Sequence, residues 1–388
     1  MITTGVLGGT WRAWVTPWGA VEPWDGSAAL EWAIAADDRW HVPAREAAVR
    51  QRRVDGTAVV ETRVRVPDGD VVQRVYSVAD HGGLTVVEVE NASPLPIAVA
   101  FTRSDLLTPR PPSAPIEGVD LPAGSVAFPI GHRATLTVAL RHTAPAAGAL
   151  PAVPTAAGAA RGWSTIVDRA GRFLLPDDVL TEAVVAARSE LALCGPADPE
   201  EAPAEFVVGV GQLVRMGERA DPWLPEVARA LESVGRNGPH DWLYAAALDA
   251  AAVVFATSGE QRALRDVGAV RAARPPAPEL PSQPPPGGAR LVAWVENTLG
   301  RGAVLLPGGL PPDWVGANFE VYGLPTGPAS TVSYAVRWHG PRPAVLWEHD
   351  GEACRLTSPA LAPEWATTEA KGEALWPAPA AVPGGRSI

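Results

Sequence analysis

The sequence predicts an α+β multidomain protein with three structured parts: an N-terminal antiparallel β-sandwich, a short antiparallel helical-hairpin block and a small C-terminal β-domain. The first observation behind this prediction is length, because 388 residues exceed what one hydrophobic core normally organises. The second is periodicity, which changes from two residues to between three and four near residue 176. The third is a pair of aperiodic stretches rich in proline and alanine that separate the parts.

These observations give six expected segments. They are the sandwich at 1–145, a linker at 146–175, the helical block at 176–272, a proline-rich linker at 273–288, the C-terminal β-domain at 289–376 and a tail at 377–388.

Residues 1–145 are expected to form short strands joined by tight turns. Valine and threonine alternate with charged residues over 59–66, as in a strand that is wet on one face. Asp55-Gly56, Asp68-Gly69 and Gly82-Gly83 accept the positive φ of tight turns. Strands about ten residues apart with such turns are typical of an antiparallel sandwich.

Helical periodicity begins near residue 177, where Asp177 or Asp178 can cap a helix that ends at Gly195-Pro196. Four further helices are expected over 205–216, from Asp221 to the residue before Gly235, from Asp241 through Phe255 and over 259–270. After the second linker, strands are expected at 291–297, 302–306, 332–338 and 343–347.

Composition excludes several function classes. A formal net charge of −11 without a basic run argues against a nucleic-acid partner. No apolar stretch approaches the roughly 18 residues of a membrane span, so no membrane partner is expected. The N-terminus has no secretory pattern, and we therefore expect a soluble, cytoplasmic protein. The two cysteines, Cys194 and Cys354, lie in no metal-binding pattern, so no metal or other cofactor is expected.

Tryptophan is unusually dense at the N-terminus. Six indoles fall within the first forty residues: Trp11, Trp14, Trp18, Trp24, Trp32 and Trp40. Exposed indoles can stack on sugar rings while neighbouring charged groups bond to hydroxyls, although the same rings could equally pack into a core. The candidate substrate-binding residues, chosen as aromatic, charged or histidine side chains near such clusters, are Trp18, Trp24, Asp25, Asp38, Trp40, His41, Arg103, Asp105 and His240.

The C-terminal region carries a family resemblance. The run Leu305-Leu306-Pro307-Gly308-Gly309-Leu310-Pro311-Pro312-Asp313-Trp314, the pair Gly323-Leu324 and the strand ending in Trp338-His339-Gly340 resemble the C-terminal β-module of six-hairpin glycosidases, which include α-L-fucosidases and disaccharide phosphorylases. The order of sandwich, helices and sheet is also similar. The resemblance implies a role in carbohydrate metabolism.

The helical block departs from that family. Its members surround the active site with a closed toroid of helical hairpins, whereas residues 176–272 have room for an incomplete one. No counterpart of the family's two catalytic carboxylates is recognisable, so the catalytic residues stay unknown and the sequence does not decide whether the protein is an enzyme.

Three hypotheses follow. The first is non-catalytic recognition or sensing of a carbohydrate through the tryptophan-rich sandwich surface. The second is a minimal glycoside hydrolase that uses acidic residues in a groove between sandwich and helices. The third is a structural or interaction scaffold, in which the exposed helical face binds a protein partner or forms a homo-oligomer.

Overall fold

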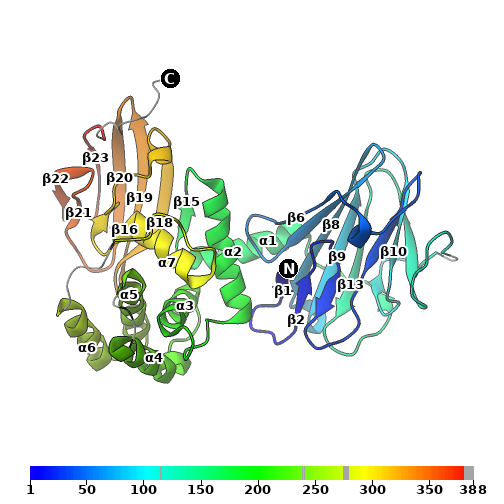
Figure 1. Cartoon of the computed structure of the whole chain (residues 1–388), viewed down its shortest axis with the longest axis horizontal. Helices are drawn as coiled ribbons and strands as arrows, with labels where there is room; N and C mark the ends of the chain where they lie inside the picture. Colours follow the sequence, from blue (N-terminus) through cyan, green and yellow to red (C-terminus); the bar gives the residue numbers. More distant parts are fainter. Residues whose placement is uncertain (114–115, 238, 240, 274–278, 380–388) are drawn as a thin grey trace. The chain divides into compact units, whose positions relative to one another are not determined.

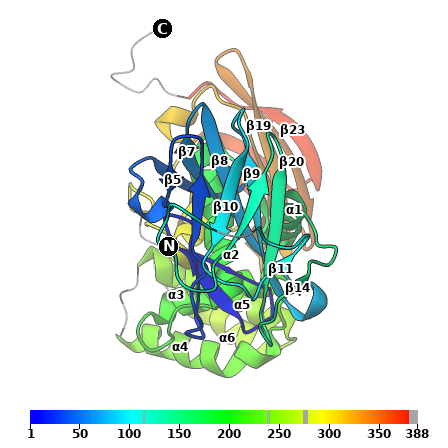
Figure 2. The same ribbon diagram turned by 90° about the vertical axis from the view of Figure 1, so that its right-hand side faces the viewer.

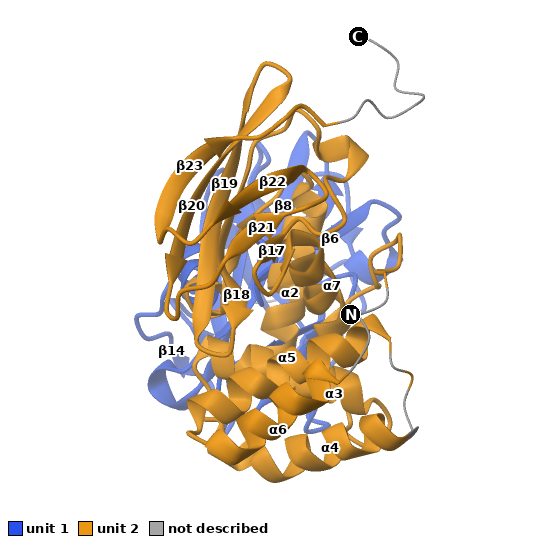
Figure 3. Cartoon of the chain, turned by 90° about the vertical axis from the view of Figure 1, so that its left-hand side faces the viewer, with its two compact units in different colours: residues 1–164 blue, residues 165–388 orange. Residues whose placement is uncertain are grey.

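The computed structural model describes residues 1–113, 116–237, 239, 241–273 and 279–379. The chain forms two compact units, residues 1–164 and 165–388 (Figures 1 and 3). The fold is mixed α+β, with seven α-helices among the described residues and sheets that are mainly antiparallel. Among these helices, none is both long and apolar enough to cross a bilayer.

Unit 1 contains three sheets. The three-stranded sheet pairs β1 (Ile2–Gly5), β2 (Arg12–Val15) and β3 (Val21–Pro23), and the four-stranded sheet runs β12 (Val126–Ile130), β10 (Ile97–Phe101), β4 (Trp32–Ala35), β5 (Trp40–His41). The seven-stranded sheet runs β14 (Gly148–Ala149), β11 (Leu107–Thr108), β13 (Thr135–Arg141), β9 (Leu84–Asn91), β8 (Gly69–Val78), β7 (Val60–Val66), β6 (Val49–Arg53). All pairs are antiparallel except β11 with β14.

Side-chain alternation explains how these sheets pack. In β7, Val60, Val64 and Val66 are buried, whereas Arg63 and Arg65 are exposed, which confirms the strand predicted at 59–66. One hydrophobic cluster takes residues from all three sheets, including Val15, Phe101 and Val87. The sheets of unit 1 therefore share one core, as expected of stacked β-layers.

The segment expected to be a linker, 146–175, is instead largely structured. It contains β14, the helix α1 (Ala156–Val167) and the strand β15 (Arg172–Leu174). Alanine has the highest helix propensity, so the alanine-rich run 156–160 favours a helix despite its low complexity. Ala156 and Ala160 pack into a second cluster of unit 1 on the seven-stranded sheet, which includes Tyr76. The prediction that residues 146–175 form an unstructured linker was therefore wrong.

The helices of unit 2 begin mostly where their caps predict. Asp177 caps α2 (Asp178–Cys194) and Asp241 caps α5 (Trp242–Thr257), each by accepting hydrogen bonds from backbone N–H groups of the first turn. The remaining helices are α3 (Pro203–Met216), α4 (Leu224–Asn237) and α6 (Gln261–Ala272). The end predicted before Gly235 was wrong, because α4 continues through it. Figure 2 shows α3 to α6 grouped together.

The strand predicted at 291–297 was also wrong, because these residues belong to the helix α7 (Gly288–Leu299). The buried positions Leu291, Val292, Val295 and Leu299 follow helical spacing, which a short apolar run conceals. The second linker thus ends where α7 begins, and its residues 274–278 lie outside the described part of the chain. Glu296, a residue of α7, lines a pocket of unit 2.

Two sheets complete unit 2. The five-stranded sheet runs β15, β18 (Phe319–Gly327), β19 (Ser330–His339), β20 (Arg342–Asp350), β23 (Lys371–Leu375), and the four-stranded sheet runs β16 (Gly300–Arg301), β17 (Val304–Leu305), β21 (Leu356–Ser358), β22 (Ala362–Thr367). The strands predicted at 332–338 and 343–347 are confirmed within β19 and β20. Of the strand predicted at 302–306, only Val304–Leu305 is a strand.

Three large apolar residues that carry the glycosidase resemblance are packing residues. Leu305, Leu306 and Trp314 are buried in a cluster that also contains residues of α2 and α7. The Trp314 ring lies 5.3 Å from that of Phe319. These side chains hold the C-terminal sheets to the helices and are not available to a ligand.

The helices of unit 2 bury their apolar faces within the unit. Helices α2 and α7 share a cluster with the C-terminal sheets, and α3, α4, α5 and α7 share another. Among the described helical residues, the large hydrophobic side chains that remain exposed are Val179 and Val270. The described helices thus present no broad exposed apolar face, and the scaffold hypothesis stays a prediction.

Candidate functional site

Seven of the nine sequence-predicted site residues fall into two groups in unit 1. Trp24, Asp25, Arg103 and Asp105 belong to the first group, because Arg103 donates to the Ala28 carbonyl and interacts electrostatically with Asp25. Arg103 also forms a two-pronged ion pair with Asp105, with Nε to Oδ1 at 2.8 Å and Nη2 to Oδ2 at 2.5 Å. The hydrogen-bonded guanidinium holds the pKa of Asp105 below its usual value.

The first group lies beside an exposed pair of indoles. Trp14 on β2 and Trp24 after β3 are 40% and 44% exposed, and their ring centroids lie 5.3 Å apart. The Trp24 amide donates to the Arg12 carbonyl at 3.0 Å, which fixes the end of β3 against β2. Glu22 lies opposite Trp14 in the strand pairing. Two aromatic faces and several charged groups therefore lie at and beside the end of β3.

Asp38, Trp40 and His41 form the second group, around the bend between β4 and β5. His41 Nε2 lies 3.0 Å from Asp38 Oδ1, and Nδ1 lies 3.3 Å from Glu46 Oε1. The hydrogen bond from His41 lowers the pKa of Asp38, which keeps this carboxyl ionised. Trp40 Nε1 donates to the Glu117 carbonyl at 2.8 Å. The contacts of this group serve mainly to hold the bend.

The other N-terminal indoles have packing roles. Trp32 is buried and donates from Nε1 to the Trp18 carbonyl at 2.9 Å, which ties Trp18 to the neighbouring strand. Trp11 stacks on His142, with ring centroids 4.0 Å apart and an interplanar angle of 8°. The remaining candidate, His240, lies outside the described residues.

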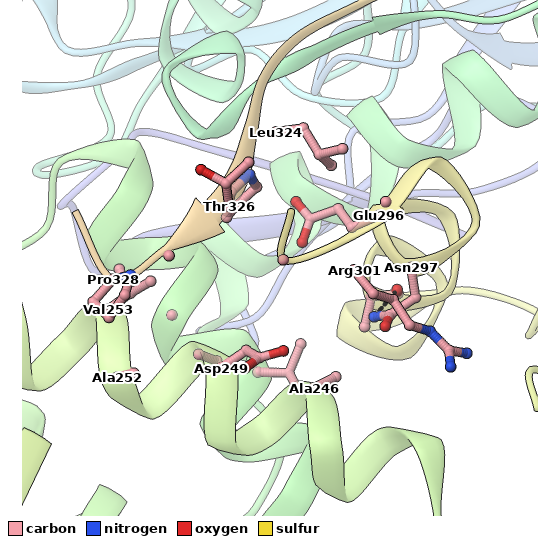
Figure 4. A pocket seen from close by; sticks show the side chains of 18 of the residues that line it. Ala246, Asp249, Ala252, Val253, Glu296, Asn297, Arg301, Leu324, Thr326 and Pro328 are labelled. Atoms are coloured by element: carbon pink, nitrogen blue, oxygen red, sulfur yellow. Dashed lines mark hydrogen bonds between the residues drawn. The ribbon is translucent and has the colours of Figure 1, made fainter. Parts of the chain in front are cut away.

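A pocket of about 80 Å³ lies within unit 2, among α3, α5, α7, β16 and the turn between β18 and β19. Figure 4 shows Asp249 on one side of this pocket, Glu296, Leu324 and Thr326 on the opposite side, and Asn297 with Arg301 at its edge. The volume is enough for about five water-sized groups, so a small ligand or one end of a larger one fits.

Close contacts at two glycines shape the pocket. A Cβ on Gly211 of α3 would lie 2.7 Å from the Cβ of Ala250, so α3 and α5 cross at a distance that only glycine permits. A Cβ on Gly300 would lie 2.8 Å from Leu324 Cδ2. Both glycines line the pocket. Small residues therefore bring the helices and the sheet together around the polar groups.

Asp249 is the single charged residue on α5, whose sequence is otherwise apolar apart from Tyr244 and Thr257. Its Oδ1 is buried and lies 2.5 Å from Arg271 Nη1, while the side chain as a whole is 41% exposed. Oδ2 is therefore the oxygen that faces the pocket. Burial raises the pKa of Asp249, although Arg271 and Arg301 oppose the effect. The same burial lowers the pKa of Arg301.

Glu296 on α7 is enclosed by donors. It accepts hydrogen bonds from Arg188 Nη2 at 3.0 Å, from Arg215 Nη1 at 2.7 Å and from Gln212 Nε2 at 3.0 and 3.1 Å. Burial alone would raise the pKa of Glu296, but the two guanidinium groups outweigh it, so the pKa lies below its usual value. Glu296 is therefore a fixed anion that orients α2, α3 and α7 around the pocket.

Arg188 and Arg215 share the Glu296 carboxylate, and Asp168 attracts Arg188 as a second negative charge. The Arg188 side chain is 2% exposed, and it also donates to the carbonyls of Ala170 and Gly171. Burial lowers the pKa of Arg188 to about 10, although Glu296 opposes the effect.

The sequence reasoning missed all of the pocket's charged groups, although two signals were present. An acidic residue in the middle of the apolar run 242–257 has no structural reason to be there, and Arg188 lies on the apolar face of its helix between Val184 and Leu191. Ionisable residues at core positions are costly unless paired, so such positions point to a network or a site.

The pocket offers hydrogen-bond acceptors and cations to a small polar molecule. Among the described residues, no group of three or more histidine, cysteine or acidic side chains could hold a metal ion. Comparison with protein-family models, with curated proteins and with solved structures found no match for this chain.

Proposed function

We propose that the protein recognises a carbohydrate, and that unit 1 binds it on the surface formed by Trp14 and Trp24. The observation that carries the proposal is the exposed, mutually contacting indole pair. Large apolar rings are normally buried, so two of them exposed side by side mark a binding surface. An indole face suits the apolar face of a pyranose, which needs no charge.

The polar residues near the indole pair also support carbohydrate binding. The hydrogen bonds from Ser27 lower the pKa of Asp25, so this exposed carboxylate is ionised and can accept hydrogen bonds from sugar hydroxyls. Arg103 lies close enough to interact with it electrostatically. The resemblance of residues 305–340 to the C-terminal module of six-hairpin glycosidases, with a shortened helical toroid, is a separate and weaker support.

Titration with neutral oligosaccharides tests the proposal. Tryptophan fluorescence and calorimetry should detect binding to at least one member of a broad panel. Removing one indole that covers about 50–80 Å² of sugar should weaken binding by roughly 1–2 kcal/mol, or about 5- to 30-fold. We therefore expect Trp14→Ala and Trp24→Ala each to lose that affinity.

Trp223→Ala is the matched control, because it removes a half-buried indole of unit 2. It should leave the affinity unchanged. A panel without any binder would refute carbohydrate recognition at this surface, and an equal loss for all three variants would show that the effect is not specific to the exposed pair.

Glycoside hydrolysis is the second candidate, and the pocket of unit 2 favours it. Asp249 and Glu296 line this pocket with pKa shifts of opposite direction, which is how acid and base roles are separated in glycosidases. Asp249 would donate the proton, since burial favours its neutral form. Turnover of aryl glycosides that is lost in Asp249→Asn would support this candidate, and background rates in both proteins would eliminate it.

A further inference from the structure

The charges that line the pocket of unit 2 do not cancel. Arg215, Arg271 and Arg301 line it together with two carboxylates, Asp249 and Glu296, so the lining residues sum to a charge of +1. Arg188 lies behind Glu296, where Asp168 opposes its charge, so the sum of +1 comes from the lining residues alone. A site with surplus guanidinium groups favours a ligand that carries a negative charge.

The two carboxylates differ in what they can offer a ligand. Both oxygens of Glu296 already accept hydrogen bonds, from Arg188, Arg215 and Gln212. Asp249 instead has one oxygen engaged by Arg271 and presents the other to the pocket. A carboxylate oxygen in this position accepts hydrogen bonds, and hydroxyl groups are the matching donors.

The cations also differ. The guanidinium of Arg215 donates hydrogen bonds to Glu296 and to the carbonyls of Ala170 and Gly323. Arg271 is 55% exposed at the pocket and Arg301 lies at its edge. Guanidinium groups in such positions recognise carboxylate or phosphate oxygens in a two-pronged manner.

We propose that this pocket binds a small hydroxylated anion, such as a sugar acid or a sugar phosphate, with Arg271 and Arg301 holding the anionic group and Asp249 accepting the hydroxyl groups. The cavity of about 80 Å³ admits the end of the molecule that bears these groups. The site is separate from the tryptophan surface of unit 1 and does not depend on the function proposed for it.

Calorimetric titration of the full-length protein tests this proposal. The probes are glucuronate, gluconate, glucose 6-phosphate, inorganic phosphate and glucose. We expect at least one hydroxylated anion to bind at least tenfold more tightly than glucose, and the comparison of carboxylates with the phosphate ester identifies the anionic group. We also expect weaker binding at higher ionic strength.

Variants separate the roles of the side chains. Arg301→Gln and Arg271→Gln should each weaken binding of the preferred anion at least tenfold. Asp249→Asn should weaken binding of the hydroxylated anion while leaving or improving the affinity for inorganic phosphate, because it removes a negative charge and keeps the shape. Arg236→Gln, an exposed arginine of α4 outside the pocket, should have no effect.

Several results would overturn the proposal. These are no binding of any anion at 10 mM by the folded protein (about a −2.7 kcal/mol limit), equal affinity for glucose and glucuronate, or unchanged affinity in Arg301→Gln. Inorganic phosphate that binds as tightly as every hydroxylated anion would also contradict it. Trp14→Ala should retain anion binding, so failure of the carbohydrate proposal for unit 1 and failure of this one give different results.

Discussion

Replacing Glu296 by glutamine or alanine should destabilise unit 2 strongly. Glu296 is 14% exposed and is the carboxylate that Arg188 and Arg215 share. Without Glu296, the guanidinium of Arg188 would lose the carboxylate with which it forms an ion pair. Its side chain is 2% exposed, so water cannot replace this partner unless the unit unfolds. Breaking a buried ion pair from one side typically costs about 3–5 kcal/mol.

The two variants should lose different amounts of unfolding free energy. Glutamine keeps the size of Glu296 and one acceptor oxygen, so Glu296→Gln loses mainly the charge, which we expect to cost about 2–3 kcal/mol. Alanine also loses the four hydrogen bonds and the packing of the side chain, which should bring the loss to about 3–5 kcal/mol.

Urea denaturation followed by circular dichroism measures the loss, and hydrogen exchange assigns it to α2, α3 and α7. Glu232→Gln is the control, because Glu232 forms an exposed pair with Arg236 and should matter by less than about 0.5 kcal/mol. The double variant Glu296→Gln with Arg188→Met should regain part of the stability, because it also removes the buried guanidinium that has lost its ion pair. A loss in Glu296→Gln no larger than that of the control would refute the reasoning.

Three other stability predictions follow from single contacts. Burial lowers the pKa of His142 to about 4, whereas the unfolded chain titrates near 6.5, so stability should fall as pH drops from about 6.5 to about 4, and His142→Gln should flatten that part of the thermal-melting profile. Tyr76→Phe removes a buried hydroxyl that lies 2.6 Å from Glu88 and should cost about 1–3 kcal/mol in urea denaturation; an unchanged midpoint would contradict this. Gly211→Ala should lower the melting temperature because its Cβ would lie 2.7 Å from a side chain of α5, whereas Gly162→Ala, with open space around it, should raise it; the same sign for both would argue against the contact.

The sequence predicted much of the fold because local signals agreed with tertiary structure. The caps at Asp177 and Asp241 locate α2 and α5, and the alternation over 59–66 locates β7. It failed where a local signal was ambiguous. The apolar run 291–297 fits either a strand or a buried helix, and only its packing in unit 2 decides for α7.

The candidate sites were harder to predict because their residues come from distant parts of the chain. Asp249 and Arg271 are separated by 22 positions, and Glu296 and Arg188 by 108. The tryptophan cluster was visible in sequence, but Trp14 and Trp24 are exposed and Trp32 is buried because of where the fold places each of them, on β2, in the turn after β3 and on β4. Composition identifies regions rich in aromatic residues, but only the folded structure shows which of these residues are exposed and which are buried in the core.

The coverage of the seven-stranded sheet by α1 has a practical consequence for dissecting the protein. A fragment ending at residue 145, the boundary that the sequence predicts, would lack β14 and the helix that buries Tyr76, and it would expose a strip of valine and leucine on a flat β-surface. Such a surface invites intermolecular aggregation. An expressed N-terminal piece should therefore extend to residue 167, the end of α1, because this helix covers the apolar residues of the sheet.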